Sequence, residues 1–386
     1  MKILIVAPTP FFSDRGTPIR VYEHVRALRS AGHAIRAVTY GGGKDIAGID
    51  IRRVPTPWKG DAFFIESFWR RIVLDAFMVC VVAWNKVRYR PDLTICYLHS
   101  GFLMGYLASF FSADKIVFDC HGILANEIVD KRIVKNKLVI NILKRLEAWM
   151  YRAAKQITVP SEVVKKKITS NYVVDEKKIA VVDDGIASTI LEYHRDNEVL
   201  EKLRRDLAIL ADHKVLIFTG FISAIAGIDM LLEAMRLLIR TDKKITLVVV
   251  GYPNEDQYKD MAEKLGIGSS VRFTGRVNYF DLPMYLDLAD IAVAPRLSQA
   301  EGNSKILNYL AIGLPVVCSD IPINHELAGA FAAYPKAPTA EALSATLAEE
   351  LKNLPKLRLA KQDRIRYVKE RYDWGAMAHF INTLIF

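Results

Sequence analysis

One histidine and its neighbours have the residue types and the position expected of a catalytic group. His121 comes directly after a run of strand-forming residues, 115–119, and is followed by Gly122. A histidine at the carboxyl end of a strand is better placed to contact a ligand than to pack in a core. We therefore predict a catalytic role for His121. His99 also follows a strand and is the alternative, whereas the other six histidines lie in contexts typical of structural residues.

A second segment combines polar side chains with a basic one at a predicted helix start. Glu301-Gly302-Asn303-Ser304-Lys305 precedes a helix that extends through Leu310. Free backbone N–H groups at a helix start attract anions, and a lysine adds positive charge. The segment therefore predicts an anion pocket, with an ordinary helix cap beside a solvated lysine as the alternative.

Two glycine-containing loops are further candidates for ligand binding. Gly16 and Thr17 precede the first predicted helix, and Gly220 and Gly227 frame a later strand-to-helix loop. Glycine lets the oxygens of a ligand approach the backbone closely. There is no G-x-G-x-x-G fingerprint, so dinucleotide binding is not indicated, and a plain turn glycine remains open for Gly16.

Short apolar runs alternate with longer amphipathic segments along the chain, and these elements must position the candidate residues. Continuous apolar runs are typical of parallel strands that are buried on both faces, with helices as crossovers. A polar stretch without strand signals, 192–212, separates two such series. We predict an α/β protein with two Rossmann-like domains facing across a cleft, and functional loops at the carboxyl ends of the strands. The predicted strands are 2–7, 34–40, 92–97, 115–119, 157–159, 179–182, 214–219, 245–251, 271–274, 291–294 and 315–319.

Length and composition exclude several classes of protein. The chain has 386 residues, 51% of them hydrophobic, which indicates a folded protein of two domains. Its four cysteines form no C-x-x-C pair, so neither a zinc site nor a disulfide framework is indicated, and a reducing cytoplasm is expected. We see no targeting segment, and no apolar run approaches the ~20 residues that cross a bilayer.

The net charge of +10 is concentrated at the two ends of the chain. Residues 1–160 carry 24 Lys or Arg against 13 Asp or Glu, and residues 351–386 carry 8 against 3. Such an excess suggests phosphate, nucleic acid or anionic lipid as a partner, although solvated helix faces are an equally open interpretation.

The whole chain resembles a retaining glycosyltransferase of family 4, which has the GT-B fold. The order and spacing of several segments carry the resemblance. They are Gly16-Thr17-Pro18, Asp119-Cys120-His121-Gly122, Val159-Pro160-Ser161-Glu162, Asp184-Gly185-Ile186, and the stretches 227–234, 271–277, 289–291 and 305–317.

The resemblance implies a role for each part of the chain. Residues 1–195 would form the acceptor-binding domain and residues 206–362 the nucleotide-sugar-binding domain. Residues 363–386 would form a helix that crosses back to the first domain, with Trp374 at its bend. His121 would contact the donor sugar, and Gly16 and Thr17 would line the reaction centre. The other implied donor-binding residues are Gly220, Arg276, Val277, Glu301, Asn303, Ser304, Lys305 and Asn308, with Arg276 and Val277 at the base and Ser304 and Lys305 at the phosphates.

Two departures from the family pattern affect the donor site. Phe221 and Ala226 stand where the family has a basic pair on the diphosphate, so Lys305 is expected to be the surviving cation. The E-x7-E motif is altered as well, because Asn308 replaces the second glutamate and Glu301 is one residue too close to it. An amide at position 308 can still hydrogen-bond a ribose hydroxyl.

Aromatic and basic residues occur together in two places, and this suggests a lipid-linked acceptor at an anionic membrane surface. Ordinary solvated lysines beside a buried helix are the alternative. The first cluster joins Phe63, Phe64, Phe68 and Trp69 to Arg70 and Arg71, and the second contains Lys131, Arg132, Lys135 and Lys137.

These features together predict a hexosyltransferase that moves a sugar from a nucleoside diphosphate to a hydroxyl or lipid-linked glycan in cell-surface polysaccharide or glycolipid assembly. The reaction would be of the front-face type, without a metal or other cofactor, at the inner face of the cytoplasmic membrane and without nucleic acid as a partner. The nucleotide is left open among UDP, GDP and ADP. A degenerate, non-catalytic subunit that binds lipid or a partner enzyme is the main alternative. A sugar-nucleotide epimerase is disfavoured because it would need more carboxylates in the cleft.

Overall fold

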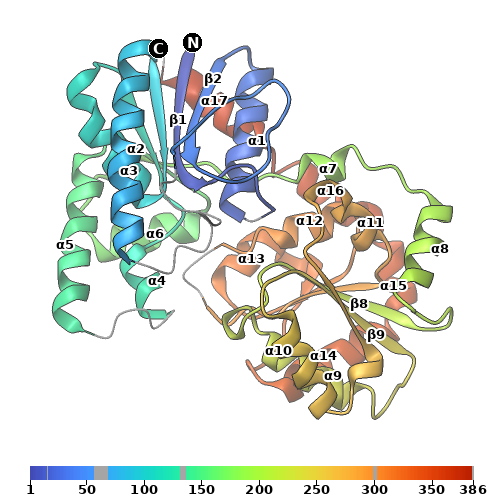
Figure 1. The fold of residues 1–386 in the computed structure, drawn as a ribbon. Helices are drawn as coiled ribbons and strands as arrows, with labels where there is room; N and C mark the ends of the chain where they lie inside the picture. Colours follow the sequence, from blue (N-terminus) through green and yellow to red (C-terminus); the bar gives the residue numbers. More distant parts are fainter. Residues whose placement is uncertain (15, 56–67, 131–135, 299–301, 385–386) are drawn as a thin grey trace. The chain divides into compact units, whose positions relative to one another are not determined.

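The computed structural model describes residues 1–14, 16–55, 68–130, 136–298 and 302–384, and it divides the chain into two compact units. Unit 1 comprises Met1–Asp184, Ala300–Gly302 and Trp374–Phe386, and unit 2 comprises Gly185–Gln299 and Asn303–Asp373. Each unit contains one parallel sheet with helices on both faces (Figure 1). The predicted parallel α/β class with two such domains is confirmed.

Unit 1 is built on a seven-stranded sheet in the order β3-β2-β1-β4-β5-β6-β7. Its inner strands are apolar throughout, and Ile3 to Ala7 of β1 are fully buried, as expected of a strand covered on both faces. The strands are β1 (Lys2–Pro10), β2 (Ala34–Tyr40), β3 (Asp50–Arg53), β4 (Leu93–Tyr97), β5 (Lys115–Asp119), β6 (Gln156–Val159) and β7 (Ile179–Val181).

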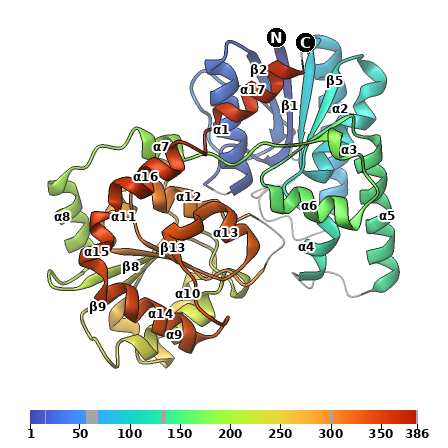
Figure 2. The ribbon, with the colours of Figure 1, turned by 180° about the vertical axis from the view of Figure 1, so that it is seen from behind.

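Helices cover both faces of this sheet (Figures 1 and 2). On one face α1 contacts α17, the last helix of the chain. On the other face α2, α3, α5 and α6 enclose a core that includes Leu4, Phe118 and Met150. The helices of unit 1 are α1 (Gly16–Ser30), α2 (Phe68–Tyr89), α3 (Leu98–Leu107) with the 3-10 turn η2 (Ala108–Phe111), α4 (Leu124–Asp130), α5 (Lys137–Ala153), α6 (Glu162–Asn171) and α17 (Gly375–Thr383).

Unit 2 is built on a six-stranded parallel sheet in the order β10-β9-β8-β11-β12-β13. Helices α9, α10 and α14 lie on one face, and α11, α12 and α16 lie on the other (Figure 2). Its core includes Phe218, Leu231 and Val249. The strands are β8 (Lys214–Thr219), β9 (Ile245–Val250), β10 (Val271–Gly275), β11 (Ile291–Ala294), β12 (Val316–Cys318) and β13 (Ala332–Ala333). The helices are α7 (Ser188–Leu191), α8 (Asn197–Asp206), α9 (Ile228–Leu238), α10 (Glu255–Lys264), α11 (Leu282–Asp287), α12 (Lys305–Ala311), α13 (Pro322–Ala328), α14 (Ala340–Lys352), α15 (Leu354–Leu359) and α16 (Lys361–Lys369).

The unit boundaries differ in detail from the expected ones. The first segment of unit 1 ends at Asp184, before residue 195, where the first domain was expected to end. The single helix expected over 363–386 is two helices, α16 in unit 2 and α17 in unit 1, and Trp374 stands between them. No helix within the described ranges is both long and apolar enough to span a bilayer.

Candidate functional site

His121 lies at the carboxyl end of β5, on a backbone that is held in place by the neighbouring strand. The Cys120 N–H group donates to the Thr158 carbonyl oxygen at 2.8 Å, which extends the ladder between β5 and β6. Asp119, the last strand residue, is fully buried, whereas the His121 side chain is about one-fifth exposed. The strand thus ends in a buried acid followed by a histidine that a ligand can reach.

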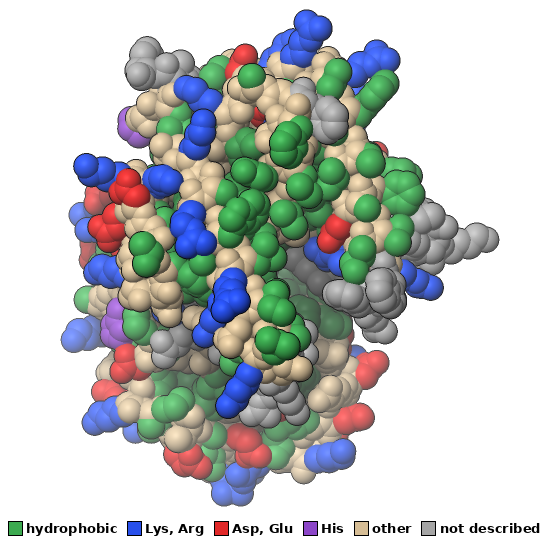
Figure 3. All heavy atoms as spheres, turned by 90° about the vertical axis from the view of Figure 1, so that its left-hand side faces the viewer, with side chains coloured by type: hydrophobic (Ala, Val, Ile, Leu, Met, Phe, Trp, Pro, Cys, Tyr) green, Lys and Arg blue, Asp and Glu red, His purple; other side chains and the backbone are tan. Residues whose placement is uncertain are grey.

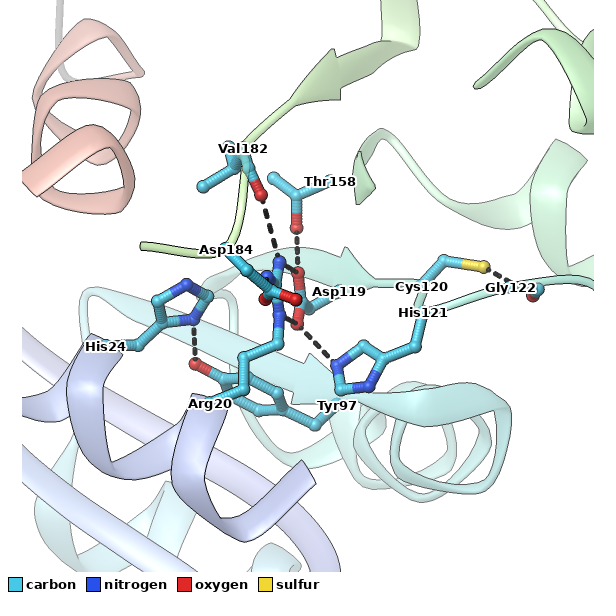
Figure 4. A network of polar contacts seen from close by, with 10 residues as sticks. All are labelled: Arg20, His24, Tyr97, Asp119, Cys120, His121, Gly122, Thr158, Val182 and Asp184. Carbon is cyan, nitrogen blue, oxygen red and sulfur yellow. Dashed lines mark hydrogen bonds and ion pairs between the residues drawn. The ribbon is translucent and has the colours of Figure 1, made fainter. Parts of the chain in front are cut away.

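Arg20 connects three segments of unit 1 at the carboxyl end of the sheet (Figure 4). It is buried near the start of α1. Its Nε and Nη2 atoms donate to the two carboxylate oxygens of Asp119 at 3.0 and 2.9 Å. Nη1 pairs with Asp184, and Nη2 also donates to the Val182 carbonyl oxygen at 3.2 Å. Because buried charges are stable only when they are paired, this cluster fixes α1 to β5 and to the segment that follows β7.

The charge on Arg20 decides the protonation of Asp119. Burial alone raises the pKa of this carboxyl group, but Arg20 and the hydrogen bond from His121 hold the pKa well below its usual value. An ionised carboxylate only accepts hydrogen bonds, so Thr158 Oγ1 donates to it at 2.7 Å and His121 Nε2 donates at 2.9 Å.

This hydrogen bond sets the tautomer of His121. With the proton on Nε2, the neutral ring has its lone pair on Nδ1, and no described residue forms a hydrogen bond with that atom. Nδ1 can therefore accept a hydrogen bond from a substrate hydroxyl, or donate one when the ring is protonated. The arrangement is that of a histidine oriented by an acid for contact with a ligand.

Two other histidines near the carboxyl end of the sheet are part of the core. His24 is fully buried, contacts Tyr97 OH through Nδ1 at 2.8 Å and packs edge-on against Trp374. Burial, followed by the charge of Arg20, lowers its pKa well below the usual value. His99, the alternative candidate, is also buried, with Nε2 at 2.9 Å from Glu147. Burial opposes its charge, but Cys120 and Glu147 raise its pKa to about 10.

Gly16 and Thr17 occupy the first turn of α1, and Arg20 begins the next turn. Gly16 is exposed, and a Cβ atom added to it would meet no heavy atom within 4 Å. Packing therefore gives no reason for a glycine at this position. Because Arg20 joins this turn to Asp119, unit 1 brings Gly16, Thr17 and His121 to the same end of its sheet.

Unit 2 gathers three glycines at the carboxyl ends of adjacent strands. Gly220 follows β8 with φ of 124°, and its N–H group donates to the Val250 carbonyl oxygen at 2.8 Å. The Gly251 N–H group, after β9, donates to the Gly275 carbonyl oxygen at 3.1 Å. A Cβ atom on Gly251 would lie only 1.8 Å from the Gly220 oxygen, so only glycine fits this close approach. Arg276, which is exposed, and Val277, which is partly buried, follow directly after the third glycine.

Lys305 extends from the start of α12 across the end of β8. A Cβ atom on Gly220 would lie 3.1 Å from Lys305 Nζ, and Nζ stands 4.1 Å from the centre of the Phe218 ring. Among the described residues, no carboxylate forms an ion pair with it; Glu301 lies outside those residues. Although the residue as a whole is partly exposed, the burial of its ammonium group and then the charge of Arg296 lower its pKa to about 7. This lysine is a cation that an anionic ligand would stabilise.

Arg296 is a candidate that the sequence reasoning missed. It follows β11, the neighbour of β8, and its charge acts on Lys305. The adjacent Leu297 N–H group donates to the Ile225 carbonyl oxygen at 3.0 Å, which places Arg296 beside the loop that contains Phe221 and Ala226. Its position just beyond the carboxyl end of a parallel strand is the signal that could have identified it.

The remaining predicted donor residues have different surroundings. Asn308 is partly exposed, and its Oδ1 accepts from the Ala187 N–H group at 3.0 Å, whereas its amide nitrogen forms no hydrogen bond with a described residue. Asn303 is buried, and its Nδ2 donates to Asn324 Oδ1 at 3.0 Å, whereas its own Oδ1 has no hydrogen-bond partner among the described residues. Ser304 is partly buried and makes no side-chain cap for α12.

The residues predicted for the membrane side lie in unit 1 where they are described. Arg70 is exposed near the start of α2, Arg71 pairs with Asp75 at 3.3 Å, and Lys137 is exposed at the start of α5. Lys131, Arg132 and Lys135 lie outside the described residues, as do Phe63 and Phe64. Within the part of the chain that the structure describes, no group of His, Cys, Asp and Glu residues could hold a metal ion.

Comparison with known proteins identifies the family. The profile "Glycosyltransferase Family 4" matches residues 15–189, and "Glycosyl transferases group 1" matches residues 199–368. The uncharacterized glycosyltransferase MJ1607 of Methanocaldococcus jannaschii is 30% identical over 194 residues, 49% of each chain. The alpha-monoglucosyldiacylglycerol synthase of Streptococcus pneumoniae is 31% identical over 170 residues, 44% of this chain and 38% of that protein. The chain thus spans about half or less of the length of these curated relatives.

The fold of the chain is similar to that of solved structures over its full length. Sucrose-phosphate synthase of Thermosynechococcus elongatus matches with a TM-score of 0.80 and 16% identity, over 100% of this chain and 98% of that one. Alr3699/HepE of Anabaena in complex with UDP and glucose matches with a TM-score of 0.79 and 16% identity, over 100% and 99%. At such identity the likeness shows the fold alone, which is the predicted GT-B fold. The two family profiles, the order of the motifs and the paired parallel sheets together show that the chain belongs to glycosyltransferase family 4.

Proposed function

We propose that the protein transfers a hexose from a nucleoside diphosphate sugar to a hydroxyl group, with retention of configuration. The observation that carries this proposal is the basic pair Lys305 and Arg296 at the carboxyl ends of β8 and β11, beside three closely packed glycines. A diphosphate is the leaving group in such a transfer, and fixed positive charge lowers the energy of the transition state in which that group departs. Lys305 and Arg296 would then take the place of the basic pair that Phe221 and Ala226 do not supply.

The other residues of unit 2 would position the donor. Asn308 has an amide nitrogen available to donate to a ribose oxygen, while its Oδ1 holds the Ala187 N–H group. The Gly220 N–H group is already bonded within the sheet, so we infer that Gly220 contributes close approach rather than a hydrogen bond. The backbone of Arg276 and Val277 would contact the base. UDP is the favoured nucleotide because the Anabaena structure of the same fold contains UDP and glucose.

In unit 1, His121 would contact the sugar through Nδ1, oriented by the Asp119–Arg20 pair. The chain's contribution to catalysis is then positioning plus electrostatic stabilisation, while the departing phosphate accepts the proton of the acceptor hydroxyl in the front-face mechanism. No metal is expected in this scheme.

A lipid-linked or glycan acceptor at the cytoplasmic face of the membrane is the proposed destination of the sugar. It is supported by similarity to a protein named as a glucosyldiacylglycerol synthase and to TuaH of Bacillus subtilis, named as a putative teichuronic acid biosynthesis glycosyltransferase, which is 25% identical over 222 residues, 56% of this chain and 53% of that protein. The exposed Arg70 and Lys137 on unit 1 agree with an anionic surface nearby.

Calorimetric titration with UDP-, GDP- and ADP-glucose, with and without EDTA, tests the proposal. We expect one donor to bind equally well in both conditions. Lys305→Ala should weaken its binding by about 1.5–3 kcal/mol, the size of a hydrogen bond to a charged group. The matched control is Lys264→Ala, an exposed lysine at the end of α10, which should bind normally. Absence of binding to every donor would refute the proposal, and binding that EDTA abolishes would refute metal independence.

A non-catalytic subunit is the second candidate function, because Phe221, Ala226 and Asn308 replace three charged residues of the family pattern. Such a subunit would bind a nucleotide weakly or not at all, and it would release no nucleotide when it is given donor and membrane lipid together. Release of UDP from UDP-glucose in the presence of lipid vesicles would exclude it.

A further inference from the structure

Helix α2 presents an apolar face outward from unit 1. Val73, Phe77, Trp84 and Val87 are exposed, and their spacing of four, seven and three residues places them on one side of the helix. Trp84 is 61% exposed. A surface helix normally directs polar residues to solvent, so an apolar outer face requires an explanation.

Neighbouring helices extend this apolar face. Phe110 of η2 is 83% exposed, and Leu138 and Ile142 of α5 are exposed as well. The turn η2 contacts α2, and α3 contacts both α2 and α5, so these side chains belong to one layer of helices. Figure 3 shows hydrophobic side chains gathered on this side of the molecule, with basic ones near them. An extended exposed apolar patch is typical of a surface that binds a protein or a membrane.

The charge of this layer favours an anionic partner. Helices α2, α3 and α5 with η2 contain eight Lys or Arg residues and only two acids, Asp75 and Glu147. Glu147 is buried and Asp75 pairs with Arg71, while Lys86 is buried, pairs with Asp114 and adds no charge to the surface. The described part of this face therefore carries basic charge with little acidic charge to neutralise it.

A hollow lined with arginines adjoins the apolar face and shares Trp84 with it. The hollow has a volume of about 620 Å³ and lies where β2, β3 and the second half of α2 meet. Arg36, Arg52, Arg53 and Arg88 line it. Arg36 and Arg52 share one carboxylate, that of Asp50, and Arg53 pairs with Asp45, so the four guanidinium groups of the hollow meet two carboxylates.

Arg88 is the residue of this set that is most available to a ligand. It is exposed, its guanidinium group lies 4.8 Å from the centre of the Trp84 ring, and no ion pair joins it to a described acid. Guanidinium groups bind phosphate in a bidentate manner, and tryptophan prefers the boundary between the headgroups and the acyl chains.

We propose that this hollow binds the phosphate headgroup of an anionic phospholipid, and that the apolar face of α2 lies in the surface of the bilayer beside it. The helix would lie along the membrane rather than cross it. This inference adds a lipid partner to the acceptor side of the proposed function, and it concerns residues that have no part in donor binding.

Vesicle co-sedimentation with the full chain tests the proposal. The protein should sediment with vesicles of phosphatidylcholine mixed with phosphatidylglycerol, and much less with phosphatidylcholine alone. The double variant Arg52→Gln/Arg88→Gln should lower binding to the anionic vesicles at least tenfold. The matched control removes two exposed arginines of unit 2, as Arg205→Gln/Arg240→Gln, and should bind like the wild type. Equal binding by both double variants, or equal binding of the wild type to both kinds of vesicle, would overturn the proposal.

Further measurements separate the bilayer from other occupants. Glycerol phosphate in solution should not displace the protein from vesicles; displacement would show a site for free phosphates instead. Phe77→Glu should abolish vesicle binding without changing the sedimentation coefficient of the protein. If the wild type is a dimer and Phe77→Glu is a monomer, the apolar face is an interface between two copies and the proposal fails. Donor titration of the same variants should be normal, so failure here is distinguishable from failure of the proposed function.

Discussion

Replacing Arg20 by methionine removes the cation that keeps Asp119 ionised, while it preserves most of the side-chain volume. The lost contacts are the two hydrogen bonds to Asp119, the pair with Asp184 and the bond to the Val182 carbonyl oxygen. Breaking a buried pair from one side costs about 3–5 kcal/mol, because the remaining charge is left uncompensated. Thr158 and His121 still donate to Asp119, so we expect a loss near the lower end, about 3–4 kcal/mol.

Tryptophan fluorescence can report this loss from unit 1 alone. All five tryptophans of the chain, at positions 58, 69, 84, 149 and 374, belong to unit 1. Urea unfolding followed at these side chains therefore measures the unit that contains Arg20, even if unit 2 unfolds separately. The control is Arg29→Met, at the exposed last turn of the same helix, which should change the free energy of unfolding by less than about 0.5 kcal/mol.

The pH dependence of the same measurement identifies the cause. In the wild type the pKa of Asp119 is lower in the folded than in the unfolded chain. The ionised Asp119 therefore adds to the free energy of unfolding above pH ~4, and this stabilisation is lost as the pH falls through the folded pKa. Without Arg20, burial dominates and raises that pKa above the unfolded value. The pH-dependent contribution of Asp119 to the free energy of unfolding should then reverse in sign, so that stability falls as the pH rises above ~4. A loss below about 1 kcal/mol, or an unchanged pH profile, would refute this account of the network.

Three further predictions concern the two candidate sites. His121→Ala should abolish sugar transfer with little change in the melting temperature, because the partly exposed ring contacts the substrate and the ion pair between Asp119 and Arg20 remains. An active variant, or one that unfolds, would assign His121 a structural role. Donor affinity should fall as the pH rises from 6 to 9, because the pKa of Lys305 is lowered to about 7 and its charge is lost over this range. In Lys305→Gln, calorimetry should show a donor affinity that depends less on pH. Ala226→Lys should strengthen donor binding if a diphosphate occupies the position typical of the family, and unchanged affinity in both Ala226→Lys and Lys305→Ala would favour the binding-subunit interpretation.

The inner strands of both sheets were predictable because burial on two faces leaves an unbroken apolar run. All eleven predicted strands are present, and four of them (34–40, 115–119, 214–219 and 291–294) have the predicted ends. The two strands that were missed, β3 and β13, lie at sheet edges. The sequence of β3 is Asp-Ile-Arg-Arg, and β13 has only two residues, so neither has the apolar pattern that a central strand requires.

The candidate site was less visible than the fold, because partners distant in sequence define it. The position of His121 after a strand was a local signal, but Arg20 looks like any other basic residue of an amphipathic helix. Its role depends on Asp119 and Asp184, which are 99 and 164 residues away. Asn303 is a second example, because its place in a polar segment did not reveal that the fold buries it against Asn324.

The return of the chain to unit 1 through α17 has a consequence for biosynthesis. The strands of unit 1 are translated first, but the helix that covers α1 is translated after unit 2. At about 5–20 residues per second, the ribosome needs roughly 10–40 s to make residues 185–373. During that time the emerging first unit lacks the Trp374 contact with His24, and it is open to capture by chaperones. The unit that begins the chain is therefore the last to be completed.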